Sequence, residues 1–485
     1  MTDGKTEVLK PNAIGPWGLA ALAIGMTSPA MGLYALWGAM QAAAGPVTPS
    51  IFLVSMLMIL PTATSYALLN REAPSAASAA AWVSATVGPA AGYQAGLLMT
   101  TYFLMAAVAQ PLMFALFFRD LLDQLHVALP HAAVLPLGIL ASSIPVAWTC
   151  LQGAETSTKS TVALMLLETF VVLALSATIL VVKSAEPNGI QFSSFDPQNT
   201  TSLHGFWAAM ILGVLAFCGF DVVSTAAEEA RAPSVHVPKA ILLTILGVAV
   251  FWAINAWVFT LSTPPALVAQ YSGEGSTAVT IVARTYWGRG DLAIILTAFT
   301  GLTAVYISSL QGASRIIFAL ARGGLFPHGL ARLAGDKRVP RNAVLTVLIV
   351  VIVADLASIL LLGNGLDAFT WWANALVFFA TLTFFSVNVA NTLYFHRYAR
   401  ARFHVFSNLL VPIAGVALNG YLIYAAFFFA LWSGNWRTGK SVVIVCVVLL
   451  SIQVGFILYI RLFRRFLPYR AIHMTPALSG RSVDE

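Results

Sequence analysis

Two acidic residues lie inside long apolar segments of this 485-residue chain. Glu168 stands within residues 165–170 (Met-Leu-Leu-Glu-Thr-Phe), and Asp221 follows residues 217–220 (Phe-Cys-Gly-Phe). A charge at the centre of a bilayer costs about 2.5–3.5 kcal/mol even by the lower estimates, so it needs a partner or a function. A desolvated carboxylate is suited to bind and release a proton. We predict that Glu168 takes up and releases a proton, with a neutral, hydrogen-bonded Glu as the alternative.

Two interruptions in apolar segments predict a binding site for a zwitterion. One is the stretch 27–32 (Thr-Ser-Pro-Ala-Met-Gly), and the other is 217–221. Unpaired backbone groups survive at mid-membrane depth only where they line protein or a cavity. Freed N–H groups favour a carboxylate and freed carbonyls favour an ammonium group, so an α-amino acid satisfies both. A simple proline kink remains the alternative at the first interruption.

The composition indicates that most of this chain lies in lipid. Hydrophobic residues make up 59% and charged residues 9%, whereas soluble domains carry about 25% charged residues. A window of about 20 apolar residues spans a bilayer. We therefore predict an all-α integral membrane protein with about twelve membrane-spanning helices, near 14–43, 46–69, 87–118, 132–151, 160–182, 205–230, 239–262, 291–320, 343–362, 367–396, 408–432 and 440–463.

The Lys and Arg residues predict the orientation. With the N-terminus in the cytoplasm, 20 of the 26 fall on the cytoplasmic side and 6 on the other. Positive loops remain inside, so we expect a multi-pass protein of the inner (plasma) membrane with both termini cytoplasmic. The net charge of +7 then reflects basic loops and not nucleic-acid binding. Lys159 is interpreted as an anchor at the cytoplasmic surface.

The two interruptions lie five helices apart and enter the membrane from opposite sides, which is typical of an inverted repeat. We predict a cytoplasmic segment 1–13, a first repeat 14–183, a second repeat 205–396, two further helices within 408–463, and a cytoplasmic tail 464–485. This prediction rests on spacing and topology.

Several motifs, in the same order along the chain, resemble those of the amino acid–polyamine–organocation permease superfamily. They are 28–34 (Ser-Pro-Ala-Met-Gly-Leu-Tyr), 219–221 with 228–233 (Glu-Glu-Ala-Arg-Ala-Pro), 237–241 (Val-Pro-Lys-Ala-Ile) and 314–322 (Ser-Arg-Ile-Ile-Phe-Ala-Leu-Ala-Arg). Gly323 replaces a frequent Asp of the family. The resemblance extends from about residue 14 to 430. It implies a five-plus-five inverted repeat of the leucine-transporter-like fold and secondary active transport.

The resemblance also implies roles for individual residues. The amides of Met31 and Gly32 would take the substrate carboxylate, and the carbonyls of Ser28 and Cys218 the ammonium group. Ala30 and Gly219 belong to the same two backbone stretches, and the glycines permit close approach. Glu168 occupies the position where many family members carry a lysine linked to coupling.

Side chains near the interruptions are expected to set specificity. Candidates at mid-depth are Phe217, Tyr102, Tyr306 and Asn374, with ordinary packing as the alternative for each. Asp221 resembles an acidic position that contributes to coupling or gating in parts of the family, and it could bind a substrate amine or cap a helix start instead.

Charged residues are expected to gather at the cytoplasmic mouth. We predict a gate formed by Glu228, Glu229, Arg315 and Arg322, with ordinary loop pairing as the alternative. Asp355, by contrast, is expected to hydrogen-bond a neighbouring helix.

The predicted function is proton-coupled import of an amino acid, with membrane lipid as the surrounding partner. One alternative is an importer of a polyamine or other organic amine, because parts of the sixth to eighth predicted helices also resemble putrescine importers. Another alternative is an amino acid exchanger. Sodium is the less favoured coupling ion, although Thr27, Ser28, Ser308 and Ser309 could offer it oxygens. No P-loop, His-Glu-x-x-His or Cys-x-x-Cys motif is present, so we expect no cofactor, metal or enzymatic activity. A channel or a receptor subunit would be a different class.

Overall fold

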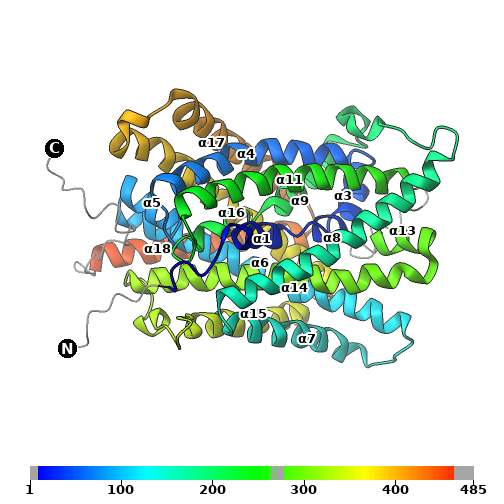
Figure 1. Ribbon diagram of the computed structural model, residues 1–485, viewed down its shortest axis with the longest axis horizontal. Coiled ribbons are helices and arrows are strands. Elements are labelled where there is room, and N and C mark those ends of the chain that lie inside the picture. Colours follow the sequence, from blue (N-terminus) through cyan, green and yellow to red (C-terminus); the bar gives the residue numbers. More distant parts are fainter. Residues whose placement is uncertain (1–8, 264–266, 268–277, 464–485) are drawn as a thin grey trace.

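The computed structural model describes residues 9–463, apart from 264–266 and 268–277, and its regular elements are helices. The long helices run in roughly the same direction along the longest axis of the molecule (Figure 1). Within the described residues, eleven helices are long and apolar enough to cross a membrane, or twelve when one bent pair counts as a single span. The predicted all-α membrane fold of about twelve spans is therefore confirmed.

The spanning helices are joined by short helical turns. The long elements are α4 (Thr48–Glu72), α6 (Pro89–Gln124), α7 (His131–Leu151), α8 (Ala154–Ser184), α9 (Leu203–Phe217), α11 (Pro233–Leu261), α14 (Leu292–Arg322), α15 (Arg341–Leu362), α16 (Gly365–Tyr398), α17 (Val411–Leu422) and α18 (Ser441–Phe463). The turns are η1 (Ser193–Phe195), η2 (Pro197–Asn199), η4 (Gly288–Asp291), η5 (His328–Ala331) and η6 (Arg400–Arg402). The π-helical η7 (Phe406–Leu410) and η8 (Ile423–Leu431) are continuous with α17 in one span, and the π-helical η9 (Trp436–Lys440) is continuous with α18.

The first span is broken as its sequence predicts. It consists of α1 (Pro16–Thr27), α2 (Met31–Tyr34) and α3 (Trp37–Ala44), with a bend of 53° before α3. Residues 28–30 leave the helix because Pro29 has no N–H to donate and Ser28 has a positive φ of 39°. This is the break named below as the α1 break.

The second predicted break is also present. The helix α9 ends at Phe217, and α10 (Val222–Thr225) follows after four residues. Gly219 has a φ of 105°, a region that side chains with a Cβ rarely adopt, so the glycine permits this turn. The span ends at Thr225, five residues before the predicted boundary, because residues 226–229 form turns and Ala230 pairs with Ile14 in a β-bridge. We call the interruption at 218–221 the α9 break.

Two short helices were not predicted. They are α5 (Ala79–Thr86) and α13 (Ala278–Trp287), of eight and ten residues. Both are far shorter than the roughly 20 residues needed to span a bilayer, so they cannot be recognised by the length of their apolar segments. The α5 helix is nonetheless buried, and Trp82 donates to the carbonyl of Ala73 at 2.7 Å.

The packing places α1 at the centre of the bundle. The α1 helix contacts α8, α11 and α14, while α6 contacts both α14 and α16. The described chain starts and ends at the same end of the bundle, at the left in Figure 1, as an even number of crossings requires. The inverted-repeat relation between 14–183 and 205–396 stays a prediction.

Candidate functional site

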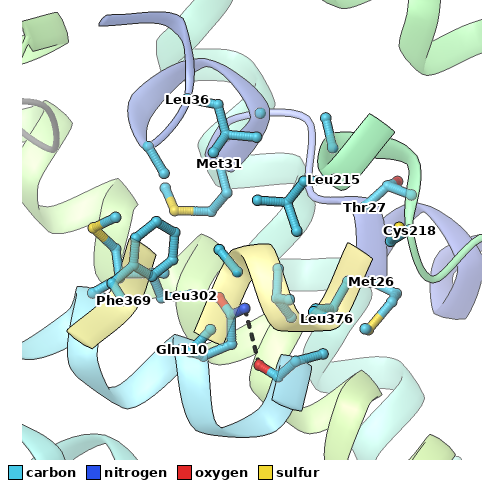
Figure 2. Close-up of a pocket in the computed structure, with 18 residues that line it drawn as sticks. Met26, Thr27, Met31, Leu36, Gln110, Leu215, Cys218, Leu302, Phe369 and Leu376 are labelled. Atoms are coloured by element: carbon cyan, nitrogen blue, oxygen red, sulfur yellow. Dashed lines mark hydrogen bonds between the residues drawn. The ribbon is translucent and has the colours of Figure 1, made fainter. Parts of the chain in front are cut away.

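A cavity of about 70 Å³ lies between the two breaks (Figure 2). Its walls come from the broken first span, α6, α9, α14 and α16. The lining residues are Met26, Thr27, Met31, Gly32, Ala35, Leu36, Ala106, Ala109, Gln110, Met113, Leu215, Ala216, Cys218, Leu302, Val305, Phe369, Ala373 and Leu376. We call this cavity the central pocket.

The walls of the central pocket are almost entirely apolar. Among its lining side chains only Thr27 and Gln110 carry strong hydrogen-bonding groups, and none is charged. The Gln110 amide donates to the carbonyl of Ala106 at 3.2 Å, which is the dashed line in Figure 2. The Thr27 hydroxyl donates to the carbonyl of Ile24 at 3.1 Å. Both groups are satisfied by their own helices, so the pocket offers mainly an apolar surface to a ligand.

The α1 break is closed by its own serine in this conformation. The N–H of Gly32 donates to the Ser28 carbonyl at 3.2 Å, and the N–H of Met31 donates to the Ser28 hydroxyl at 3.2 Å. The carbonyl of Ala30 accepts from two amides of the following turn. Trp252 of α11 donates to the Pro29 carbonyl at 2.8 Å. A carboxylate that took the Met31 and Gly32 amides would therefore have to displace Ser28.

Other carbonyls at the breaks lose their helical donors. The N–H of Met31 bonds to the Ser28 side chain and not to the carbonyl of Thr27, four residues before it. The N–H of Phe220 bonds to Phe217 at 3.4 Å and not to Ala216. Thr27 and Ala216 both line the central pocket.

The carbonyl of Cys218 also loses its helical donor, because the N–H of Val222 donates to the Gly219 carbonyl at 3.0 Å. Cys218 lines the pocket too, and Gly219 lies against Met26 of α1, which brings the two breaks into contact. Of the six predicted backbone residues, Met31, Gly32 and Cys218 line the pocket, whereas Ser28, Ala30 and Gly219 lie behind its wall.

Three predicted specificity side chains point elsewhere. Phe217 packs edge-on against Trp252, with ring centroids 5.0 Å apart. Tyr306 lies 3.3 Å from the Ser143 hydroxyl of α7. Asn374 donates to a backbone carbonyl of η9 at 3.3 Å. None of the three lines the central pocket.

In each case the preceding residue lines the pocket instead. Ala216, Val305 and Ala373 all belong to the pocket wall. One residue turns an α-helix by about 100°, so an error of one position moves a side chain to a different face. The pocket wall is built from these smaller neighbours, which leaves room for a ligand side chain.

Tyr102 and Asp221 form a buried pair next to the pocket. The Tyr102 hydroxyl donates to the Oδ2 of Asp221, and both residues are fully buried. Tyr102 lies about one turn before Ala106 on α6, and Ala106 lines the pocket. The Oδ1 of Asp221 and the hydroxyl of Tyr66 have no hydrogen-bond partner among the described residues. Asp221 thus bonds to a side chain on α6 and does not cap α10.

Glu168 reaches the α1 break from α8. Its side chain is fully buried, and the Ser28 hydroxyl lies 2.9 and 3.0 Å from its two carboxylate oxygens. Gly301 of α14 makes room for this contact, since a Cβ there would collide with Oε2 of Glu168. The same Cβ would also lie 3.1 Å from Met31. The carboxylate therefore sits where α1, α8 and α14 meet, directly behind the break.

The four predicted gate residues form two ion pairs. Arg315 lies 2.6 Å from Glu229, and both side chains are buried, at 5% and 8% exposure. Arg322 binds both carboxylate oxygens of Glu228, at 2.6 and 3.1 Å. Burial raises the pKa of Glu229, and the neighbouring Arg315 guanidinium opposes that rise. The buried carboxylate depends on this partner to remain charged.

Backbone hydrogen bonds close the same end of the molecule. The N–H of Ile14 donates to the Glu229 carbonyl at 2.9 Å, and the N–H of Arg231 donates to the Ile14 carbonyl at 2.9 Å. The segment before α1 is thereby fixed to the loop after α10.

The prediction for Asp355 is wrong. Asp355 of α15 is fully buried, but neither carboxylate oxygen has a hydrogen-bond partner among the described residues. The residues around Asp355 in α15 are apolar, so the sequence did not indicate that its carboxylate lacks a hydrogen-bond partner. In the described part of the chain, no group of three or more His, Cys, Asp and Glu side chains is arranged to hold a metal ion.

Sequence reasoning missed Trp252 and Gly301. Trp252 fills the space beside Gly32 and binds the α1 break, and Gly301 admits Glu168. Each is separated by more than 130 residues of sequence from the residue that it contacts, so no local sequence pattern indicates its role. A glycine within an apolar helix was the one available signal, because it often marks close approach.

Comparisons with known proteins show the family of this chain. The family model described as "Amino acid permease" matches residues 18–469. The branched-chain amino acid permease BcaP of Bacillus subtilis (strain 168) is 25% identical over 341 residues, covering 67% of this chain and 70% of that protein. BcaP of Lactococcus lactis subsp. cremoris (strain MG1363) is 26% identical over 329 residues, covering 64% and 68%. The low-affinity putrescine importer PlaP of Escherichia coli (strain K12) is 21% identical over 408 residues, covering 81% and 84%. This chain belongs to the amino acid permease family.

Proposed function

We propose that this protein is a proton-coupled importer of amino acids with aliphatic side chains. The observation that carries the proposal is the central pocket, which joins an apolar wall to the polar backbone of two broken helices. Such a site matches a ligand with charged groups at one end and a hydrocarbon at the other. The names of the BcaP relatives agree with this substrate class.

Backbone groups of the two breaks are assigned to the charged groups of the substrate. The carbonyls of Thr27, Ala216 and Cys218 would accept from the ammonium group, because their helical donors bond elsewhere. The amides of Met31 and Gly32 would bind the carboxylate once Ser28 turns away. The site thereby exchanges an internal hydrogen bond for one to the ligand, as a reversible binding site requires.

The wall chemistry favours an aliphatic amino acid over a diamine. A diamine has no carboxylate for the Met31 and Gly32 amides, and no charged side chain lines the central pocket to bind its second ammonium group. The buried carboxylates beside the two breaks, Asp221 and Glu168, are hydrogen-bonded to Tyr102 and Ser28. The cavity of about 70 Å³ is well below the roughly 300 Å³ at which typical ligand pockets begin, so the pocket must widen around its ligand.

Proton coupling is assigned to Glu168 through Ser28. The Ser28 hydroxyl donates to the carboxylate and accepts from the Met31 amide, so one residue joins the proton site to the substrate site. Protonation of Glu168 weakens the first bond, which frees Ser28 to release the Met31 amide. Two of the hydroxyls considered for sodium, those of Thr27 and Ser309, donate to carbonyls of their own helices.

Alternating access would proceed by opening the two ion pairs at the cytoplasmic mouth. Glu229–Arg315 and Glu228–Arg322 close this end in the present conformation. We place the protein in the plasma membrane with both termini cytoplasmic, in keeping with the distribution of Lys and Arg.

The test is a thermal-shift series on the purified protein. Leucine, isoleucine and valine are compared with lysine, glutamate and putrescine. A ligand at 100 times its Kd stabilises the folded protein by about 2.7 kcal/mol, which is readily measured. We expect stabilisation by the three aliphatic amino acids alone. Stabilisation by lysine or putrescine, without any by leucine, would overturn the assigned substrate class.

A further inference from the structure

A second cavity, of about 460 Å³, lies at the cytoplasmic start of α1 and α8. It shares no lining residue with the central pocket, although α1 contributes residues to both cavities. Its lining comes from four places: the segment before α1, α1 itself, α8 and the loop after α10. The lining residues are Lys10, Asn12, Ala13, Ile14, Gly15, Trp17, Gly18, Glu155, Thr158, Lys159, Val162 and Arg231.

The charge of this cavity is positive. Lys10, Lys159 and Arg231 face one acid, Glu155. Lys159 and Glu155 lie 3.0 Å apart, but their side chains are 78% and 62% exposed, so this pair contributes little and competes poorly with another anion. Among the described residues, the Arg231 guanidinium is hydrogen-bonded through its Nε, which donates to the Asn12 carbonyl at 3.2 Å.

An apolar surface continues from the cavity along α8. Lys159 and Val162 line the cavity, and Leu166 and Phe170 follow one turn apart on the same side of the helix. Leu166 is 61% exposed and Phe170 is 70% exposed. In a membrane-spanning helix such side chains face acyl chains.

Trp17 marks the depth of this site. It lines the cavity and is 86% exposed, although tryptophan is among the most costly side chains to leave in water. Tryptophan is enriched where the polar headgroups meet the hydrocarbon. Trp17 therefore places the three cations at headgroup level and the apolar face of α8 at the level of the acyl chains.

We propose that this cavity binds one anionic phospholipid of the cytoplasmic leaflet. The phosphate lies among Lys10, Lys159 and Arg231, and an acyl chain follows Leu166 and Phe170. Free inorganic phosphate would use the cations but gains nothing from Trp17 or the apolar face. The lipid contacts both the segment before α1 and the loop after α10, which the Ile14 backbone already joins, so it stabilises the closed cytoplasmic end.

The test compares two matched double variants of the purified protein. Lys159→Gln/Arg231→Gln removes two cations from the cavity. Arg332→Gln/Arg341→Gln removes two exposed cations outside it. Each protein is titrated with phosphatidylglycerol or phosphatidylcholine in mixed micelles, and the retained lipid is counted by native mass spectrometry. Inorganic phosphate at millimolar concentration is the third arm.

We expect the wild type and the control variant to retain one phosphatidylglycerol. The cavity variant is expected to bind this lipid roughly thirtyfold more weakly, because it lacks the electrostatic attraction of two basic side chains. Phosphatidylcholine is not retained, and phosphate neither displaces the lipid nor raises the melting temperature. Equal retention by both variants, or competition by phosphate, would overturn the proposal. Trp17→Ser keeps every charge and is also expected to weaken binding, which provides a second variant should the double variant fail to fold.

Discussion

The substitution Glu168→Gln removes the proposed proton carrier with little change in shape. Glu168 is fully buried behind the α1 break, with the Ser28 hydroxyl 2.9 and 3.0 Å from its two oxygens. A glutamine keeps a carbonyl oxygen that accepts from Ser28 but never ionises. The break therefore remains formed, while its response to protonation is lost.

The magnitude follows from the Ser28 bond. A hydrogen bond to a charged group contributes about 1.5–3 kcal/mol, and one between neutral groups about 0.5–1.5 kcal/mol. Protonation of Glu168 thus weakens the Ser28–Glu168 hydrogen bond by on the order of 1 kcal/mol. This changes the equilibrium between the bonded and released positions of Ser28 severalfold. One coupled proton driven by one pH unit supplies about 1.36 kcal/mol, enough for tenfold accumulation of substrate.

The assay is leucine accumulation in proteoliposomes that are one pH unit more acidic outside. We expect the wild type to approach tenfold accumulation and Glu168→Gln to reach no accumulation, while exchange of internal for external leucine persists. Glu155→Gln is the matched control, because Glu155 lies on the same helix with its side chain 62% exposed. Full pH-driven accumulation by Glu168→Gln would show that Glu168 does not carry the coupled proton. Loss of exchange together with accumulation would show a structural role instead.

Three further substitutions test other parts of the site. Gly301→Ala places a Cβ against the carboxylate on α8, so we expect loss of pH-driven uptake, whereas Gly247→Ala, with no atom within 4 Å of its Cβ, leaves uptake unchanged. Arg315→Gln leaves Glu229 buried without its cation, which is expected to lower the stability of the closed state by about 3–5 kcal/mol; thermal unfolding measures the loss, and an unchanged melting temperature would contradict the buried pair. Phe369→Leu shortens a side chain in the pocket wall. We expect it to raise uptake of phenylalanine relative to valine by about tenfold, as competition assays would show, whereas an unchanged ratio would remove this wall from the substrate site.

The predictable part of this fold was set by local chemistry. Pro29 and Gly219 break their helices because one lacks an N–H and the other lacks a Cβ, and both effects act within a few residues. The spans themselves follow from apolar length. The short helices α5 and α13 lack that length, so their burial depends on neighbours that the sequence does not reveal.

The predicted specificity residues lie on helices that line the central pocket, but on other faces of those helices. Phe217, Tyr306 and Asn374 each lie one residue after a pocket-lining neighbour, because a helix turns by about 100° per residue and the rotation of a spanning helix is set by packing. The grouping of Glu228, Glu229, Arg315 and Arg322 into ion pairs could be predicted, since buried charges must find partners of opposite sign, whereas their role as a gate stays a prediction.

Solute counterflow with the purified protein shows whether it carries aliphatic amino acids by alternating access. Proteoliposomes loaded with unlabelled leucine are diluted into a trace of labelled leucine, without any pH gradient. We expect a transient accumulation of label that unlabelled isoleucine or valine abolishes and putrescine does not. An overshoot with putrescine in place of leucine, or equilibration of leucine without any overshoot, would contradict a carrier of aliphatic amino acids.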